Sequence, residues 1–236
     1  MRAVVTGAAQ GIGRGIAERL TEDGYEVVRL DLRGEGVVAC DVGDPDSVAR
    51  AAAEVGPVDV LVNNAGIWVY GNIRNTAADD IERVLRVNLI GVFNCIRSFG
   101  EGMVARGKGS IVNIASISAI APSPSVGAYS ASKAGVVALT QQTALDWGPL
   151  GVRCNAVGPG MIMTEGTSDA YAEKEVFDAR SRAVPLQRLG TVRDIAEVVA
   201  FLASDRAAYV TGQVVYVDGG LTQSLFQLLP YPARPD

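Results

Sequence analysis

Short runs of valine, isoleucine and leucine recur along the whole chain, and stretches with helical periodicity separate one run from the next. Most runs are continuously apolar, which is typical of strands buried on both faces of a parallel sheet. Strands that alternate with helices form βαβ units, so we expect an α/β fold with a doubly wound, seven-stranded parallel sheet flanked by helices. The seven predicted strands are residues 3–6, 26–31, 37–40, 58–62, 110–114, 152–157 and 214–217.

Residues that open helices stand between the predicted strands. Asp44 and Pro45 have the residue types of an N-cap and a first helical turn, before a helix that runs through 48–55. A Thr-x-x-Asp pattern at Thr76 and another at Thr191 predict two more helix N-termini. Apolar stripes at helical spacing support helices after the first strand and after Thr191: Ile12, Ile16 and Leu20, then Ile195, Val198, Val199 and Leu202.

Nothing along the chain divides it into parts. It has no repeat, low-complexity tract or linker, so we expect a single domain over residues 1–236. Residues 161–190 are irregular and rich in small and polar side chains, which fits a substrate lid and a surface insertion equally well. The tail, residues 221–236, either covers a partner subunit's pocket or is frayed.

Composition excludes several classes of function. Apolar residues make up 48% of the chain and charged residues 20%, which is ample for a core. A net charge of −5 argues against binding to a nucleic-acid backbone, which needs a basic face. No run of 18 apolar residues is present to span a membrane, and the first residues read as a strand rather than a signal peptide. We therefore expect a soluble, cytoplasmic protein.

The chain has no histidine and three widely spaced cysteines, Cys40, Cys95 and Cys154. An odd number at such spacing predicts neither a disulfide framework nor a metal knuckle. Each cysteine is therefore expected to be a small core residue, and we expect no metal site.

Without histidine, a tyrosine beside a lysine is the leading candidate for general acid/base chemistry. Tyr129 and Lys133 are four residues apart, so a helix would place the phenol and the ammonium on one face. A nearby cation favours the phenolate, and we expect it to lower the tyrosine pKa from about 10. Ser116 could hold a substrate oxygen beside the phenol. Taken alone, the pattern favours an aromatic ring packed under a lysine stem over a catalytic pair.

Glycines cluster where the first predicted strand meets the first helix. Gly7, Gly11 and Gly13 would let the backbone turn tightly and approach a pyrophosphate at the helix N-terminus. Their spacing, Gly-x3-Gly-x-Gly, differs from the commoner Gly-x-Gly-x-x-Gly fingerprint. Asp31 ends the second strand, where an acid would meet the adenosine ribose hydroxyls. This acid weakens the alternative of a glycine-rich turn without a ligand.

Asn88 lies in the middle of an apolar helical stripe formed by Ile81, Leu85, Val92 and Ile96. A buried amide without partners costs about 1–3 kcal/mol, so Asn88 should have a specific role. From its position alone, a structural hydrogen bond to neighbouring backbone is the favoured interpretation.

In this order, the motifs resemble those of the short-chain dehydrogenase/reductase family in its shorter, non-extended form, over about residues 1–220. The glycine motif is similar to the family's cofactor loop, and Asn88, Ser116, Tyr129 and Lys133 are similar to its catalytic tetrad. Further similar segments are Cys40-Asp41-Val42, Asn63-Asn64-Ala65-Gly66, Asn155 to Gly160 followed by Ile162 and Thr164, and Val217-Asp218-Gly219-Gly220.

The resemblance implies a Rossmann-type fold that binds NAD along the carboxyl edge of the sheet. It implies that Tyr129 exchanges a proton with the substrate oxygen and that Ser116 donates a hydrogen bond to that oxygen. It implies further that Lys133 lowers the tyrosine pKa and binds the ribose, and that Asn88 holds a relay water. The implied cofactor contacts are Gly7, Gln10, Gly11, Ile12, Gly13, Asp31, Asp41, Val42, Asn64, Ala65, Gly66, Tyr129, Lys133, Pro159, Gly160, Ile162 and Thr164.

NAD is expected over NADP because a 2′-phosphate would face the charge of Asp31, although Arg33 could neutralise it. Three functions stay open: an NAD-dependent secondary alcohol/ketone oxidoreductase, an NADPH-dependent 3-oxoacyl-[acyl-carrier-protein] reductase, and a non-catalytic nucleotide sensor. Trp68, Tyr70, residues 118–126 and residues 161–190 are the expected walls of a mostly apolar substrate pocket. The resemblance and the small residues within 130–145 favour a homotetramer.

Overall fold

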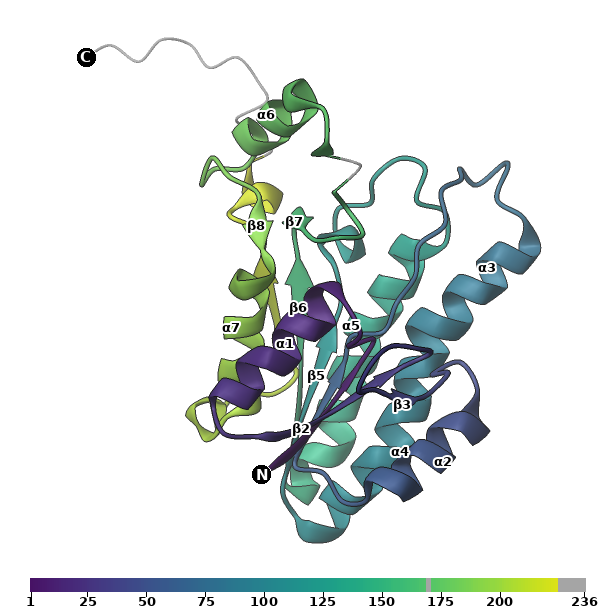
Figure 1. Ribbon diagram of the computed structural model, residues 1–236, viewed down its shortest axis with the longest axis vertical. Helices are drawn as coiled ribbons and strands as arrows, with labels where there is room; N and C mark the ends of the chain where they lie inside the picture. Colours follow the sequence, from purple (N-terminus) through teal and green to yellow (C-terminus); the bar gives the residue numbers. More distant parts are fainter. Residues whose placement is uncertain (169–170, 225–236) are drawn as a thin grey trace.

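In a computed structural model of this chain, residues 1–168 and 171–224 can be described. Seven strands form one fully parallel sheet in the order β3-β2-β1-β4-β5-β6-β9 (Figure 1). The predicted α/β fold is therefore confirmed. The strands are β1 Arg2–Thr6, β2 Glu26–Asp31, β3 Val38–Ala39, β4 Val60–Asn63, β5 Gly109–Ile114, β6 Val152–Pro159 and β9 Val214–Val217.

Strand order reverses beside β1, since β2 and β3 lie on one side of it while β4, β5, β6 and β9 follow on the other. Helices leaving the carboxyl ends on the two sides turn to opposite faces of the sheet, which opens a crevice between them. The principal helices are α1 Gly11–Glu22, α2 Pro45–Val55, α3 Ala78–Leu85, α4 Gly91–Arg106, α5 Tyr129–Trp147, α6 Lys174–Ala183 and α7 Val192–Ala203.

Two hydrophobic clusters cover the two faces of the sheet. Along β1, Val4 packs into one cluster with side chains of α2, α4 and α5. Its neighbours Ala3 and Val5 pack into the other, with side chains of α1 and α7. All three are fully buried. Successive side chains of a strand point to opposite faces, so burial of both faces explains the continuously apolar runs.

Two of the three predicted helix N-termini are capped as expected. The Asp44 carboxylate accepts a hydrogen bond from Asp46 N at 3.0 Å, and Thr191 forms a capping box with Asp194. The helix predicted after Thr76 is present, but Thr76 does not cap it. Helix α3 begins at Ala78 without a side-chain cap, because the Thr76 hydroxyl donates to the carbonyl of Asn72 at 2.7 Å instead.

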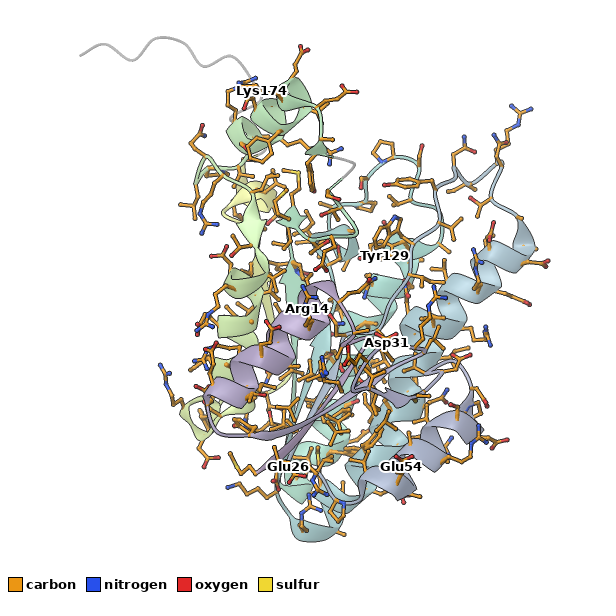
Figure 2. The ribbon with its side chains drawn as sticks, viewed as in Figure 1. Arg14, Glu26, Asp31, Glu54, Tyr129 and Lys174 are labelled. Carbon is orange, nitrogen blue, oxygen red and sulfur yellow. The ribbon has the colours of Figure 1, made fainter. Side chains whose placement is uncertain are left out.

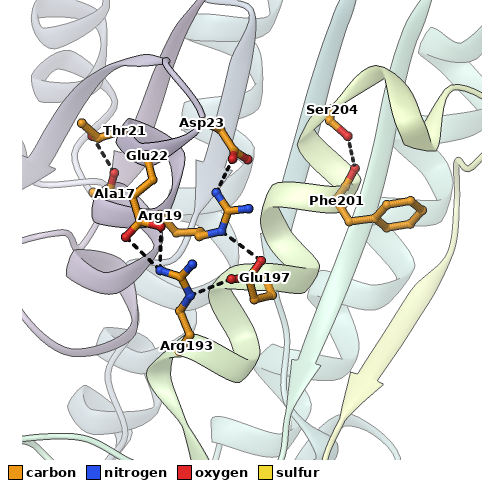
Figure 3. A network of polar contacts seen from close by, with 9 residues as sticks. All are labelled: Ala17, Arg19, Thr21, Glu22, Asp23, Arg193, Glu197, Phe201 and Ser204. Carbon is orange, nitrogen blue, oxygen red and sulfur yellow. Dashed lines mark hydrogen bonds and ion pairs between the residues drawn. The ribbon is translucent and has the colours of Figure 1, made fainter.

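Helices α1 and α7 lie side by side on one face of the sheet (Figure 1). An ion-pair network joins their exposed surfaces: Arg19 bridges Asp23 and Glu197, and Arg193 bridges Glu197 and Glu22 (Figure 3). Exposed ion pairs are individually weak, but shared partners fix several side chains together. The network holds the first turns of α7, which contain Arg193 and Glu197, against α1.

Two short strands that the sequence did not predict close the base of residues 161–190. Strand β7, Ile162–Met163, pairs with β8, Gly190–Thr191. Helix α6 lies between them in sequence and projects beyond the carboxyl ends of the sheet strands (Figure 1). The segment therefore stands over the crevice. Residues 221–223 form a short 3₁₀ turn, and the rest of the predicted tail, 225–236, lies outside the described residues.

No helix within the described parts of the chain is long and apolar enough to cross a bilayer.

Candidate active site

A cleft of about 730 Å³ opens at the carboxyl ends of the sheet strands. Its walls come from the glycine loop, from the ends of β2, β4, β5 and β6, from α5 and from the segment that carries α6. Asp31 and Tyr129 both line it (Figure 2). In open α/β sheets, ligands bind in such a crevice, at the point where the strand order reverses.

Most of the predicted site residues converge on this cleft. The three exceptions, Gly13, Asn88 and Ser116, do not line it; Asn88 and Ser116 are buried at 0% and 8% exposure, next to residues that do. The predicted residues that line the cleft are Gly7, Gln10, Gly11, Ile12, Asp31, Asp41, Val42, Asn64, Ala65, Gly66, Tyr129, Lys133, Pro159, Gly160, Ile162 and Thr164.

The glycine loop is tightly packed on its inner side. A Cβ on Gly13 would lie 2.2 Å from the carbonyl oxygen of Gly7, so only glycine fits there. Gly7 itself has φ +64°. The Asn64 amide donates to the carbonyls of Thr6 and Gly7, both at 3.0 Å, which joins the loop to the end of β4. Gly13 therefore serves packing rather than direct ligand contact.

The outer side of the loop presents the N-terminus of α1 to the cleft. A Cβ on Gly11 would meet only Thr164, at 3.9 Å, so a side chain would project into open space. The Gly11 N–H donates to the Glu165 carboxylate at 3.0 Å, and Arg14 forms an ion pair with the same carboxylate. The hydrogen bond from Gly11 is the main cause that lowers the pKa of Glu165. A carboxylate thus occupies the kind of position where helix N-termini hold anions.

Asp31 is fixed against the glycine loop. One carboxylate oxygen accepts from Ala9 N at 2.9 Å and the other from Leu32 N at 2.8 Å. Arg33 also lines this end of the cleft. The acid at the end of β2 is therefore oriented, and a cation stands two residues beyond it.

Tyr129 and Lys133 lie one turn apart at the start of α5, with the Lys133 ammonium nitrogen 5.7 Å from the centre of the phenol ring. The ammonium donates to the carbonyl of Ile114 at 2.8 Å. Ser116 follows β5, and its side chain lies close enough to the Tyr129 phenol to lower the phenol pKa. Ser116 Oγ also accepts from Ser118 N at 3.1 Å, which leaves its own proton available to donate.

Comparison with known proteins places this arrangement in a family. A family profile described as "Enoyl-(Acyl carrier protein) reductase" matches residues 7–222. A 3-oxoacyl-[acyl-carrier-protein] reductase (FabG) from Staphylococcus aureus is 38% identical over 240 residues, which cover 93% of this chain and 97% of that protein. The chain belongs to the short-chain dehydrogenase/reductase family.

Solved structures agree with this assignment. The aldohexose dehydrogenase of Thermoplasma acidophilum matches with a TM-score of 0.90 and 36% identity, over 100% of this chain and 97% of that one. A gluconate 5-dehydrogenase from Burkholderia cenocepacia, in complex with NADP and tartrate, matches with a TM-score of 0.91 and 33% identity. That match covers 95% of this chain and 96% of the other. Two dehydrogenases named for different substrates thus share the fold of this chain.

The sequence predicts that Lys133 lowers the pKa of Tyr129. The structure differs from this prediction in the direction of the pKa shift. Burial raises the pKa of Tyr129 above its ordinary value, and the nearby Ser116 side chain only partly offsets this. Lys133 is itself buried, and burial lowers its pKa to about 8. The desolvation of both groups, which the sequence spacing does not reveal, therefore sets the direction of both pKa shifts.

Asn88 lies in a short π-helical segment, Arg86–Ile90, between α3 and α4. Its amide oxygen accepts from Ile67 N, and its amide nitrogen donates to the carbonyl of Ile67, both at 2.8 Å. The amide nitrogen also donates to Ser132 Oγ at 3.1 Å. This agrees with the backbone interpretation of Asn88. The water relay implied by the family stays a prediction.

The floor of the cleft is kept open by a glycine. A Cβ on Gly66 would stand 3.4 Å from the Asn88 amide oxygen and 3.5 Å from the Lys133 ammonium. Bare backbone at this position leaves room beside the ammonium for a ligand. Together with the glycine loop at the N-terminus of α1 and the oriented Asp31, these residues fit a dinucleotide.

The sequence predicted fewer of the residues at the substrate end of the cleft than at the cofactor end. Of residues 118–126 only Val126 lines it, and Ile120 is exposed to solvent. Tyr171 and Arg180 line the cleft from residues 161–190, but no local motif marked them individually. Glu165 and Arg14 were missed as well, because their pairing joins positions 151 residues apart. Among residues 1–168 and 171–224, no three Cys, Asp or Glu side chains gather as metal ligands would.

We predict that Lys133→Met stabilises the protein at pH 7. Lowering the pKa of Lys133 from 10.5 to about 8 corresponds to a cost of about 3 kcal/mol. The lost hydrogen bond to Ile114 offsets part of it, by about 1 kcal/mol. Below pH 8 both the folded and unfolded chains hold the proton, so the cost is complete. Between pH 8 and 10.5 only the unfolded chain holds it, so wild-type stability rises relative to the variant.

Urea denaturation at pH 7 and pH 10 tests this prediction, with the exposed Lys108→Met as the control. The variant should exceed wild type in unfolding free energy at pH 7, and the difference should shrink at pH 10. An unchanged or lower stability of Lys133→Met at pH 7 would contradict the account of its burial.

Proposed function

We propose that this protein is an NAD-dependent dehydrogenase that interconverts a secondary alcohol and a ketone. One observation carries the proposal. Tyr129 lines the cleft beside Ser116, with the Lys133 ammonium one helical turn away. This is the constellation of a proton donor, an oxygen-binding hydroxyl and a supporting cation.

The nicotinamide cofactor, when bound, supplies or accepts the hydride. The glycine loop and Asp31 would hold its adenosine half. Residues at the end of β6, Pro159 to Thr164, would hold its nicotinamide half. Lys133 would bind a ribose hydroxyl from the cleft floor, beside Gly66.

The protein's own residues handle the proton. In reduction, Tyr129 donates its proton to the substrate oxygen, and in oxidation its phenolate accepts the proton of the alcohol. Ser116 donates a hydrogen bond to the same oxygen, for which its proton is available because its oxygen already accepts from Ser118 N. A phenol with a raised pKa is held protonated at neutral pH, which suits a proton donor in ketone reduction.

A second candidate is a reductase of 3-oxoacyl-[acyl-carrier-protein] substrates that uses NADPH. The FabG relative at 38% identity supports it, as does Arg33, which lines the adenosine end of the cleft. Asp31 opposes it, because a 2′-phosphate would meet a carboxylate fixed in place by two backbone N–H groups. The aldohexose and gluconate dehydrogenases among the structural matches favour a small polar alcohol over an acyl chain. A non-catalytic nucleotide sensor would not need all of Asn88, Ser116, Tyr129 and Lys133, so the presence of all four argues against that function.

We propose a homotetramer of single-domain subunits. Ile90 and Phe93, at the start of α4, are each 49% exposed, and Leu145 of α5 is 72% exposed. Exposed apolar side chains along neighbouring helices are typical of a surface that another subunit covers. Light scattering should give a mass near four times 24.6 kDa, and a particle of one chain's mass would contradict the assembly.

Two further expectations from the sequence stay predictions: a cytoplasmic location, and a lid function for residues 161–190. Support for the lid is the position of α6 beyond the strand ends and the lining of the cleft by Tyr171 and Arg180.

Tyr129→Phe should abolish turnover while it preserves fold and cofactor affinity. The substitution removes one oxygen, so packing changes little, but the proton donor is gone. General acid/base catalysis is worth about 10²- to 10⁴-fold, and kcat should fall by at least that range. Tyr70→Phe is the matched control, since it removes the same atom from an exposed ring in the same cleft. If Tyr129→Phe keeps more than about a tenth of wild-type kcat, the catalytic assignment is wrong and the sensor hypothesis gains support.

Cofactor choice tests the adenosine end independently. Wild type should show a higher kcat/KM with NAD than with NADP. In Asp31→Ala the ratio of the NAD value to the NADP value should fall towards one. Like charges about 4 Å apart cost roughly 4 kcal/mol at an effective dielectric of 20, so the preference should be large. Arg33→Ala should raise the ratio of the NAD value to the NADP value. The substitution removes a cation that lines the cleft near Asp31 and could neutralise a 2′-phosphate. Equal kcat/KM values for both cofactors in wild type would favour the NADPH-dependent alternative.

A further inference from the structure

The two ends of the cleft differ in charge. Asp31, Arg33 and Asp41 line the adenosine end, where acids and a cation balance. Beyond Tyr129, the charged side chains that line the cleft are Lys133, which is fixed to the Ile114 carbonyl, and Arg180 of α6. Among residues 1–168 and 171–224, no carboxylate lines this end. Within this described part of the chain, Arg180 is therefore a cation at the substrate end without an acid to balance it.

Arg180 is oriented by an aromatic ring rather than by an acid. Its guanidinium lies 5.1 Å from the centre of the Tyr171 ring, and Tyr171 is only 9% exposed. None of the ion pairs or side-chain hydrogen bonds between described residues involves Arg180. By contrast, Lys174 on the same helix pairs with Asp178 at 2.6 Å. A guanidinium stacked on a ring keeps its N–H groups directed along its edges, where they are free to bind a planar anion.

Aromatic and small residues line the same cleft as Arg180. Trp68 and Tyr70 follow β4 and are 46% and 72% exposed. A Cβ on Gly166 would approach the Trp68 ring to 3.7 Å, so the segment that leads to α6 lies directly against this wall. An apolar cleft with one oriented cation fixes the orientation of a ligand through its single charged group.

We propose that the substrate carries one carboxylate, which Arg180 binds while the carbinol or carbonyl carbon lies at Tyr129. The substrate is thus a hydroxy acid or the corresponding oxo acid. A carboxylate fits because the flat guanidinium fork pairs with it bidentately, with matched single charges. A phosphate monoester would carry close to two negative charges against one arginine. This inference rests on the proposed dehydrogenase function.

Binding of matched acid and neutral ligands tests the inference without turnover. The two pairs are D-gluconate with D-glucitol, and mandelate with 1-phenylethane-1,2-diol, each differing only in a carboxylate or a CH₂OH group. Calorimetric titrations use protein saturated with whichever reduced nicotinamide cofactor binds more tightly. The variants are Arg180→Met and the control Arg182→Met, which removes a cation from the same helix that does not line the cleft.

In at least one pair, wild type and Arg182→Met should bind the acid at least tenfold more tightly than its neutral partner. In Arg180→Met the two partners should bind within about twofold of each other, with affinity for the neutral ligand unchanged, as expected for loss of one bidentate pair. Equal binding of acid and neutral ligands by wild type, or an acid preference retained in Arg180→Met, would overturn the inference. Tighter binding of D-glucitol 6-phosphate than of gluconate would also overturn it.

Failure of the proposed function would look different. An acid preference that depends on Arg180, in a protein that transfers no hydride to any alcohol or ketone tested, would leave the carboxylate site intact and refute the dehydrogenase. Turnover of neutral alcohols without a preference for acids would support the dehydrogenase and refute the carboxylate site.

Discussion

Burial of a phenol and an ammonium at the carboxyl edge of the sheet is the constraint on which the site depends. Lys133 is 4% exposed and is held by a single backbone carbonyl, at the end of β5. That contact fixes the start of α5 and therefore the position of Tyr129, one turn earlier. Burial also sets the direction of both pKa shifts, upward for the phenol and downward for the ammonium. The same desolvation that costs stability favours the protonated form of the Tyr129 phenol.

The glycine loop and the segment after β6 meet across this edge. Glu165 reaches from that segment to the first N–H of α1 and to Arg14. An anionic group that binds at this helix N-terminus therefore meets a carboxylate of the protein's own chain. The arrangement couples the position of residues 161–190 to the cofactor loop through two polar contacts. A change in the position of residues 161–190 is therefore expected to change the position of the glycine loop, and the reverse.

Much of this could be read from the sequence, because the signals were local. Continuous apolar runs marked the sheet strands, since both faces of the sheet are covered. The glycine spacing, Asp31 and the Tyr129–Lys133 pair located the cleft. What failed depended on packing between distant segments. Thr76 caps no helix because a turn uses its hydroxyl, and Arg180 reaches the cleft only because the chain folds back through β7 and β8. The direction of the Tyr129 pKa shift could not be derived from spacing, because it is set by burial of the phenol, which depends on tertiary packing.

The proposed reaction joins hydride transfer to the substrate carbon with proton transfer from Tyr129 to the substrate oxygen. The most direct test is a single-turnover reaction of a ketone with reduced cofactor that carries deuterium at C4, read by mass spectrometry of the alcohol. The account predicts one deuterium on the carbinol carbon with wild type. With Tyr129→Phe, cofactor affinity should be equal but label transfer at least about a hundredfold slower. Label that reaches the alcohol equally fast in both proteins would contradict it.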